Sequence, residues 1–482
     1  MILRAAPSLG GSDQLVLLAV DEYGLPLQAG VVRQLSPHTT PCGSTRKVLE
    51  PGPAGAPDSR RVSYYGSVHR VGDELLMWYL GQGDEPGWFQ RVCLARSRDG
   101  YHWEKPDLGL VEYHGSRHNN LVDLSQGTHH VQACVVVDDP LEPRPERRFK
   151  MAFQSRKYGN AFAAAYSPDG RRWREAAGNP VGPHLEMAGG TRFGDLYLLS
   201  GQGGHHGPPP RQLVTHLSYD FERWSEGFAV GLHRGEGPPA TGNRGEQVHL
   251  GAALWNRGHV LVGFYGQWRG HPSNDRRLVT MDLGLALSLD GLTFREPVPG
   301  AAIVAAAEDG WETLPGGTGG VQYPALIQGQ GFANVGDETL FWYAPWPEQR
   351  SDGVRVARWP RDRLGYVQAL AGGRDPKRGG PHVLSAPIDL QGRGARVWLN
   401  ASGLSPHTPL TVQVLGERLE PLADYGAEAV VAVSESGLRQ PVAWRGRSAV
   451  AVPDGAVRLR IGFEGLRRED ARLHAVYVEA AD

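Results

Sequence analysis

The sequence is poor in cysteine, in net charge and in long apolar runs. Its three cysteines, Cys42, Cys93 and Cys134, are an odd number without metal-ligand spacing, so we expect neither a disulfide framework nor a metal site. The 50 Lys and Arg residues nearly balance the 52 Asp and Glu residues. A surface that binds nucleic acid or an anionic membrane needs clustered positive charge, so neither is an expected partner.

Targeting signals are missing as well. The segment from Met1 to Pro7 contains no apolar core of signal-peptide length, and no later run is long enough to span a bilayer. We therefore expect a cytoplasmic protein, although a secreted protein whose leader had been removed would look the same.

No segment shows convincing helical periodicity. Instead, 65 Gly and 36 Pro residues separate short apolar runs, as turns do between strands. The clearest of these runs are Leu75–Tyr79, Phe149–Phe153, Leu196–Leu199, Val260–Tyr265 and Thr339–Tyr343. The chain is therefore predicted to be all-β.

One short motif recurs along the chain and gives it a period. It reads Ser97-Arg98-Asp99-Gly100 with Trp103 in the first copy, and the later copies begin at Ser167, Ser218 and Ser288, which lie 70, 51 and 70 residues apart. The Asp accepts hydrogen bonds from turn amides, the Gly takes a positive φ, and the aromatic residue anchors the next strand. Such a hairpin repeated at a fixed period predicts a β-propeller, and a degenerate fifth copy of the motif near residues 357–366 predicts five blades.

This period divides the sequence into three predicted parts. Residues 1–57 read as one or two strands and a lead-in, and residues 58–384 as the five-bladed propeller. Residues 385–482 contain alternating strands and read as a C-terminal β-sandwich. Small residues precede the apolar run of each blade, which is typical of the crowded innermost strand. The residues that open these strands are expected to line a central pocket.

The chain resembles the five-bladed propeller glycosidases, a superfamily that includes glycoside hydrolase families 32, 43 and 68. The resemblance lies in Ser97–Gly109, Arg147–Lys150, Glu186–Gly190, Val335–Glu338 and the sandwich segment Trp398–Asn400. It implies a carbohydrate ligand, no cofactor, and catalytic carboxylates that open the inner strands of the first three blades. The first and second blades depart from this pattern, because Ser63 and His129 stand near the positions where acids are expected.

Four residues are candidates for catalysis. Glu186 opens the third inner strand and is the expected general acid, since a glycosidase needs one protonated carboxyl group and one ionised partner. Asp58, Glu246 and His130 are candidate partners. The alternative for each acid is a solvated loop or turn residue, and for the histidine a hydrogen-bonded structural residue.

Five further residues are expected to contact the sugar because they lie at or near the starts of inner strands or in the connections that follow them. They are Tyr64, Gln132, His249, Trp268 and Gln322. Exposed indoles in particular stack on the apolar faces of sugar rings. Core packing is the alternative for any one of the aromatic residues.

Three functions remain open from the sequence. The favoured one is hydrolysis of a glycosidic bond, with a furanosidic bond as one option. The second is phosphorolysis, for which Arg192, His205 and Arg211 would supply the phosphate site. The third is a carbohydrate-binding propeller without catalysis, which the missing acids of the first two blades favour.

Overall fold

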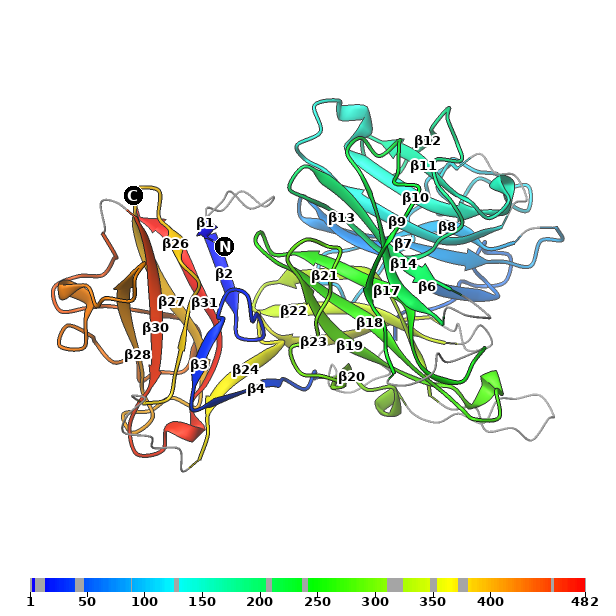
Figure 1. Ribbon diagram of the computed structural model, residues 1–482. Helices are drawn as coiled ribbons and strands as arrows, with labels where there is room; N and C mark the ends of the chain where they lie inside the picture. Colours follow the sequence, from blue (N-terminus) through cyan, green and yellow to red (C-terminus); the bar gives the residue numbers. More distant parts are fainter. Residues whose placement is uncertain are drawn as a thin grey trace.

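The computed structural model describes residues 2–4, 14–39, 47–87, 89–124, 130–204, 210–235, 242–309, 324–346, 353–371, 380–451 and 455–481. These residues form strands, turns and a few 3₁₀ turns of three or four residues, which confirms the all-β prediction. No helix in the described part of the chain is long and apolar enough to cross a membrane. Figure 1 shows two bodies side by side, each built largely from antiparallel sheet.

The larger body consists of successive antiparallel sheets. Three of them have four strands each: β9 (Val131–Asp138), β10 (Phe149–Ser155), β11 (Phe162–Ser167) and β12 (Arg174–Glu175); β13 (Glu186–Phe193), β14 (Leu196–Gly203), β15 (Gln212–Ser218) and β16 (Ala229–Leu232); β17 (Gly245–Asn256), β18 (Leu261–Gly270), β19 (Thr280–Ser288) and β20 (Ala302–Val304). A seven-stranded sheet holds β6 (Arg61–Val71), β7 (Glu74–Gln82), β8 (Arg91–Ser97), β21 (Leu326–Val335), β22 (Glu338–Pro345), β23 (Val354–Pro360) and β5 (Lys47–Leu49).

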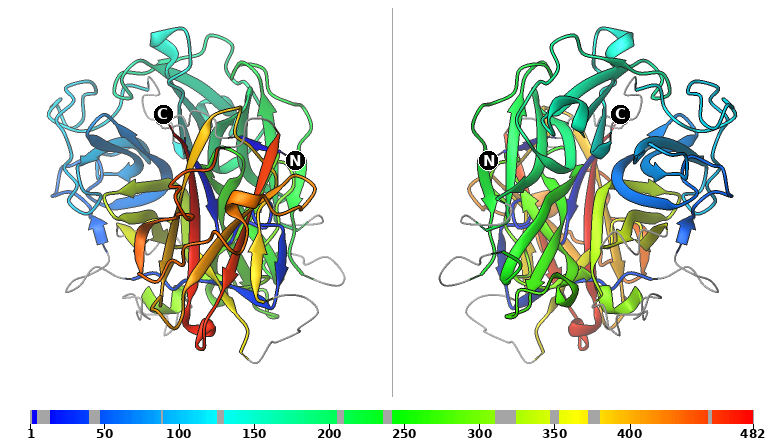
Figure 2. Two further views of the ribbon diagram at one scale, coloured as in Figure 1. Left: turned by 90° about the vertical axis from the view of Figure 1, so that its left-hand side faces the viewer. Right: turned by 90° about the vertical axis from the view of Figure 1, so that its right-hand side faces the viewer.

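The seven-stranded sheet joins the two ends of the series. Its two halves pair where β21 runs parallel to β6, at Gln330 and Ser67. The first strands of the hairpins also contact one another in a closed circuit, from β6 to β9, β13, β17, β21 and back to β6. In the right-hand view of Figure 2 the blue, cyan and green segments accordingly occupy successive sectors around the body.

The repeated turns lie between the third strand and the outermost segment of their sheets. In the first copy the Asp99 carboxylate accepts hydrogen bonds from the amides of Tyr101 and His102 at 2.8 and 2.9 Å, and Gly100 has a φ of 81°. Each turn also packs on the preceding sheet, as where the indole of Trp78 donates to Gly170 O at 2.8 Å. The indole of Trp342 in β22 donates to Gly100 O at 3.0 Å. The first repeated turn therefore packs on the other half of the seven-stranded sheet, and this contact also closes the circuit.

The centre of the circuit is filled by polar side chains that bond to backbone. Gln330 from β21 accepts from the amides of Gly190 and Leu254 at 3.3 and 2.7 Å, so one side chain joins three sheets. Gln328 donates to His249 O at 3.0 Å. These bonds satisfy buried backbone groups where the first strands diverge and cannot form a ladder.

The smaller body consists of two six-stranded sheets around one apolar core. One sheet holds β1 (Leu3–Arg4), β26 (Ile388–Asp389), β30 (Ala456–Phe463), β25 (His382–Leu384), β3 (Leu27–Ala29) and β28 (Leu410–Gly416). The other holds β29 (Gly437–Pro441), β27 (Gly394–Ser402), β31 (Arg472–Ala481), β24 (Gly365–Ala369), β4 (Val31–Leu35) and β2 (Gln14–Leu18).

These pairings differ from the predicted division at residues 57 and 384. Strands β1 to β4 belong to the smaller body, where Figure 1 shows the blue N-terminal strands among the red C-terminal ones, and β5 completes the last sheet of the larger body. Strands β24 and β25 also belong to the smaller body although they precede residue 385. A strand pairs with partners hundreds of residues away, and no local sequence pattern records that choice.

Candidate active site

The first strand of each hairpin is interrupted near its start. The pairing register shifts between Ser63 and Ser67 in β6, at Gln132 in β9, between Met187 and Gly189 in β13, between His249 and Ala252 in β17, and between Gln328 and Phe332 in β21. A β-bulge of this kind changes the direction in which a side chain leaves the sheet, and such bulges are frequent beside active sites. Of the residues at or just before these shifts, Glu186 carries the only carboxylate.

Glu186 is held between two sheets. The Gln132 amide from β9 donates to its Oε1 at 2.8 Å, and Gln202 from the neighbouring strand β14 lies 3.5 Å from its Oε2. The residue is half-buried, so Glu186 is positioned by its neighbours without being sealed in the core. Gln202 was not predicted as a site residue; the signal for it is that it pairs directly with Glu186 across the hairpin.

A buried arginine lies near this carboxylate. Arg211 is 2% exposed, and its guanidinium stands 4.1 Å from the ring centre of Trp268. Burial and the charge of Arg276 lower the pKa of Arg211 to about 10, while the charge of Glu186 acts in the opposite direction. Gln132, Glu186, Gln202 and Arg211 are called the Glu186 cluster below.

An aromatic group borders the cluster. The ring of His249 stacks on Trp268 with centres 5.6 Å apart, and Trp346 meets both rings at 5.4 Å. Trp268 was predicted to offer an exposed ring to a sugar, but it is 0% exposed. The side chains of Arg211 and His249 cover the Trp268 ring instead of a sugar, and His249 itself is 4% exposed.

Another residue expected to contact the sugar, Tyr64, lies away from the Glu186 cluster. Tyr64 is 0% exposed, and its hydroxyl donates to Gln330 O at 3.4 Å in the centre of the circuit. Because it is buried, its pKa is raised well above the usual value and it serves the packing of β6 against β21. Gln322 lies outside the described residues, as does His205 of the expected phosphate site.

The candidate partners of Glu186 are dispersed. Glu246 has a side chain 48% exposed and lies 3.6 Å from Arg234, in an ion pair at the edge of β17. His130 precedes β9 and packs its ring against Phe89 at 6.2 Å, edge to face. It is half-buried and only two residues from Gln132, so it remains the candidate nearest in sequence to the cluster.

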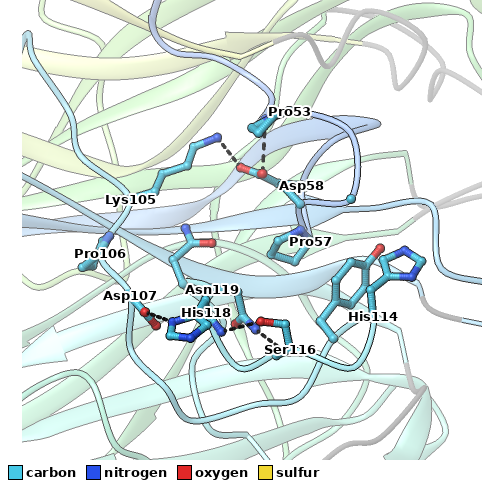
Figure 3. Close-up of a pocket in the computed structure, with 15 residues that line it drawn as sticks. Pro53, Pro57, Asp58, Lys105, Pro106, Asp107, His114, Ser116, His118 and Asn119 are labelled. Atoms are coloured by element: carbon cyan, nitrogen blue, oxygen red, sulfur yellow. Dashed lines mark hydrogen bonds and ion pairs between the residues drawn. The ribbon is translucent and has the colours of Figure 1, made fainter.

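Asp58 lies in a separate cavity of about 280 Å³, shown in Figure 3. It is 0% exposed, and its carboxylate receives Lys105 Nζ at 2.5 Å and the Tyr79 hydroxyl at 2.7 Å. Figure 3 shows this cavity bordered by the loop that carries Asp107 and His118. Gln132 and Gln202, which hold Glu186, do not line this cavity.

The remaining expectations concern ions. Arg192, named for a phosphate site, pairs with the buried Asp139 at 2.9 Å, between strand β13 and the end of β9, so its charge is neutralised there. In the described ranges, no group of three or more His, Cys, Asp or Glu side chains is placed to hold a metal ion. The structure therefore brings together Glu186 and Gln132 of the predicted residues, with Arg211 close by.

Comparison with known proteins gives similarity in overall structure alone. No family model and no curated protein matches the chain. A glycosyl hydrolase from Bacteroides ovatus aligns over 68% of this chain and 95% of its own, with 14% identity and a TM-score of 0.43. The family 32 β-fructofuranosidase of Bombyx mori aligns over 90% of this chain and 93% of its own, with 11% identity and a TM-score of 0.37. What the site of this protein does must therefore be argued from its own residues.

Proposed function

We propose that the larger body is a five-bladed β-propeller, that the smaller one is a β-sandwich, and that the protein hydrolyses a glycosidic bond at the Glu186 cluster. The circuit of first strands supports five blades, with the seven-stranded sheet formed by the first and the last blade. In a propeller the starts of the inner strands border the axis, where ligands are bound. The substrate would be a carbohydrate, and a furanosidic bond remains one option.

The observation that carries the proposal is the position of Glu186. It is the one acid among the residues at the strand interruptions, it is half-buried, and Gln132 holds its Oε1 at 2.8 Å. A carboxyl group in such a place can transfer a proton to the leaving oxygen as the glycosidic carbon–oxygen bond breaks. Water then bonds to the sugar carbon and releases a proton, so the atoms balance without a covalent enzyme intermediate.

A direct displacement fits the placement of the other acids. A retaining mechanism needs a second carboxylate about 5–5.5 Å from the first, on the other side of the bond. Asp58 is engaged with Lys105 at 2.5 Å, and Glu246 with Arg234 at 3.6 Å. The mechanism we propose therefore uses one protein carboxyl group and an external nucleophile, with His130 as the candidate base.

Phosphorolysis is a second candidate function. The observation that favours it is the position of the Arg211 cation near Glu186. Inorganic phosphate is itself an ionised nucleophile and needs no protein base, whereas it does need a cation to hold it. Arg211 provides a permanent positive charge close to Glu186. The two reactions are separated by whether product forms from a substrate in phosphate-free buffer.

Replacing Glu186 by Gln tests the proposal, with Glu246→Gln as a control of equal charge change. The assay compares two sets of substrates. One is a panel of nitrophenyl furanosides and pyranosides, whose cleavage is measured by the release of nitrophenol, and the other is the set of matching alkyl glycosides. If Glu186 donates a proton, Glu186→Gln loses roughly 10²- to 10⁴-fold in kcat on the alkyl glycosides and much less on the nitrophenyl ones. Glu246→Gln keeps the parental rate on both.

Two results would contradict this role. A Glu186→Gln variant as active as the parent would remove Glu186 from the site. A variant equally slow on good and poor leaving groups would show that Glu186 does not protonate the leaving oxygen. Sugar binding by the parent without turnover of any glycoside would favour the binding protein over the enzyme.

A further inference from the structure

Two arginines flank the pair of tryptophans beside the Glu186 cluster. The guanidinium carbon of Arg211 lies 4.1 Å from the ring centre of Trp268, and that of Arg276 lies 4.6 Å from the ring centre of Trp346. The two indole rings are 5.4 Å apart. Arg211 precedes β15, whereas Arg276 comes from the connection between β18 and β19. Two separate connections therefore each place a guanidinium on the same aromatic pair.

The aromatic faces fix the positions of both guanidinium groups. A cation over an indole ring is attracted by the negative face of the ring, and the planar guanidinium also stacks on it. Arg211 is held further by Gly242 O at 2.8 Å and by Gln247 Oε1 at 3.2 Å. Its orientation is thus set before any ligand arrives, and ordering it on binding would cost little.

The charge of this pair is not neutralised within the described part of the chain. No carboxylate there lies in ion-pair contact with Arg211 or Arg276, and every hydrogen bond of the Arg211 guanidinium goes to a neutral oxygen. Arg234, another buried arginine of this body, is instead paired with Glu296 at 3.2 Å. Arg211 is therefore a buried cation without a contacting anion, an arrangement that desolvation disfavours.

The two guanidinium groups also repel each other. The charge of Arg276 is one of the causes that lower the pKa of Arg211, together with its burial. The charge of Glu186 acts in the opposite sense but balances only one of the two cations. An arriving anion would relieve both the repulsion and the missing neutralisation, which is the electrostatic condition for an anion site.

We propose that Arg211 and Arg276 form a binding site for an oxyanion next to the Glu186 cluster. The planar fork of guanidinium donors matches the oxygens of a carboxylate or a phosphate. The oxyanion comes either from inorganic phosphate or from an acidic substituent of the sugar, such as the carboxylate of a uronic acid. This inference rests on the proposed function for its location and extends it to the charge of the ligand.

The test compares anion binding by four purified full-length proteins in calorimetry at low ionic strength. They are the parent, Arg211→Gln, Arg276→Gln and the control Arg277→Gln. Arg277 is the neighbour of Arg276 in the same turn and is already paired with Asp275 at 2.7 Å. The probes are inorganic phosphate, glucuronate and galacturonate, with glucose and galactose as their neutral counterparts.

The parent and Arg277→Gln should bind at least one anionic probe more tightly than the neutral sugars, with an affinity that falls as salt is raised. Arg276→Gln should weaken that binding about tenfold or more, because it removes one of two charge-assisted contacts. Its urea midpoint should stay at the parental value, since Arg276 is exposed and makes no ion pair within the described residues. This variant keeps the test decisive even if Arg211→Gln fails to fold.

The outcomes separate this inference from the proposed function. Binding of phosphate alone identifies phosphate as the source of the oxyanion, and binding of a uronate alone identifies a sugar carboxylate. No anion binding, or binding that Arg276→Gln leaves unchanged, overturns the inference even where Glu186→Gln has abolished turnover. Anion binding that persists in an inactive parent protein would retain the oxyanion site and discard the enzyme.

Discussion

Removing the Asp99 carboxylate should destabilise the protein without changing the chemistry of the Glu186 cluster. The carboxylate accepts hydrogen bonds from the amides of Tyr101 and His102 and from Ser97 Oγ, and it pairs with His102 Nδ1 at 2.7 Å. Partial burial acts to raise its pKa, but these hydrogen bonds, with that of the His102 ring the largest, lower it to about 2. The folded protein thus stabilises the ionised form.

The size of the effect follows from this pKa and from exposure. A pKa about 2 units below the usual value corresponds to roughly 2.5 kcal/mol. The side chain is 48% exposed, so solvent screening leaves about 1 kcal/mol of that. Asp99→Ala also leaves turn amides without their acceptor, which costs about 1 kcal/mol more after partial rescue by water. We expect a loss of about 2 kcal/mol in the free energy of unfolding at pH 7.

The assay is urea denaturation of the parent and Asp99→Ala at several pH values. A carboxyl group with a depressed pKa contributes its stability above the unfolded pKa near 4 and loses it as the pH falls toward 2. The difference between the proteins should therefore be constant from pH 8 to 5 and shrink below pH 4. The matched control is Asp73→Ala, in the exposed turn between β6 and β7. Equal midpoints of Asp99→Ala and parent at pH 7 would refute the reasoning.

Three further substitutions test the buried polar groups. Lys150→Met should cost about 3 kcal/mol in urea denaturation, because Lys150 and its partner Asp139 are both 0% exposed and the loss leaves a buried carboxylate with fewer partners. Gln330→Leu should lower the free energy of unfolding by about 2–4 kcal/mol, because the amides of Gly190 and Leu254 lose their shared acceptor and Leu254 O loses its donor. An unchanged urea midpoint would refute the bridging role. Burial, with the charge of Arg363, lowers the pKa of His474 to about 3, so the parent should lose about 1.4 kcal/mol per pH unit below pH 6.5, and His474→Gln should lose less.

The features that could be predicted from the sequence are local ones. The Asp99 turn depends on residues within six positions of one another, and its hydrogen bonds form as the motif implies. Glu186 could be placed at the start of a first strand because small residues follow it directly. The neighbouring Gln132 was found by the same reasoning, from its place near the start of a small-residue strand.

The features that could not be predicted depend on distant residues. Asp58 was a candidate partner for Glu186, but its environment is set by Lys105 and Tyr79, which reach it across the sheet. Trp268 was expected at the surface, and it is the packing of Arg211 and His249 that buries its faces. A pattern along the chain shows that a ring is large and apolar but not which residues cover it.

The Glu186 cluster exists only when the circuit of sheets is closed. Gln132 comes from the sheet of β9 to β12, and Glu186 and Gln202 come from the sheet of β13 to β16. The Arg211 stack also needs Trp268 from the sheet of β17 to β20. Their relative positions depend on contacts far from the cluster, such as the Trp342 indole on Gly100 O, which joins the two halves of the seven-stranded sheet. Interiors are close-packed and transmit such displacements, and a shift of about 1 Å is enough to cost a catalytic group much of its effect. Under the proposed function, the repeated turns therefore act on the site through stability, because they hold together the sheets that carry the carboxylate and its partners.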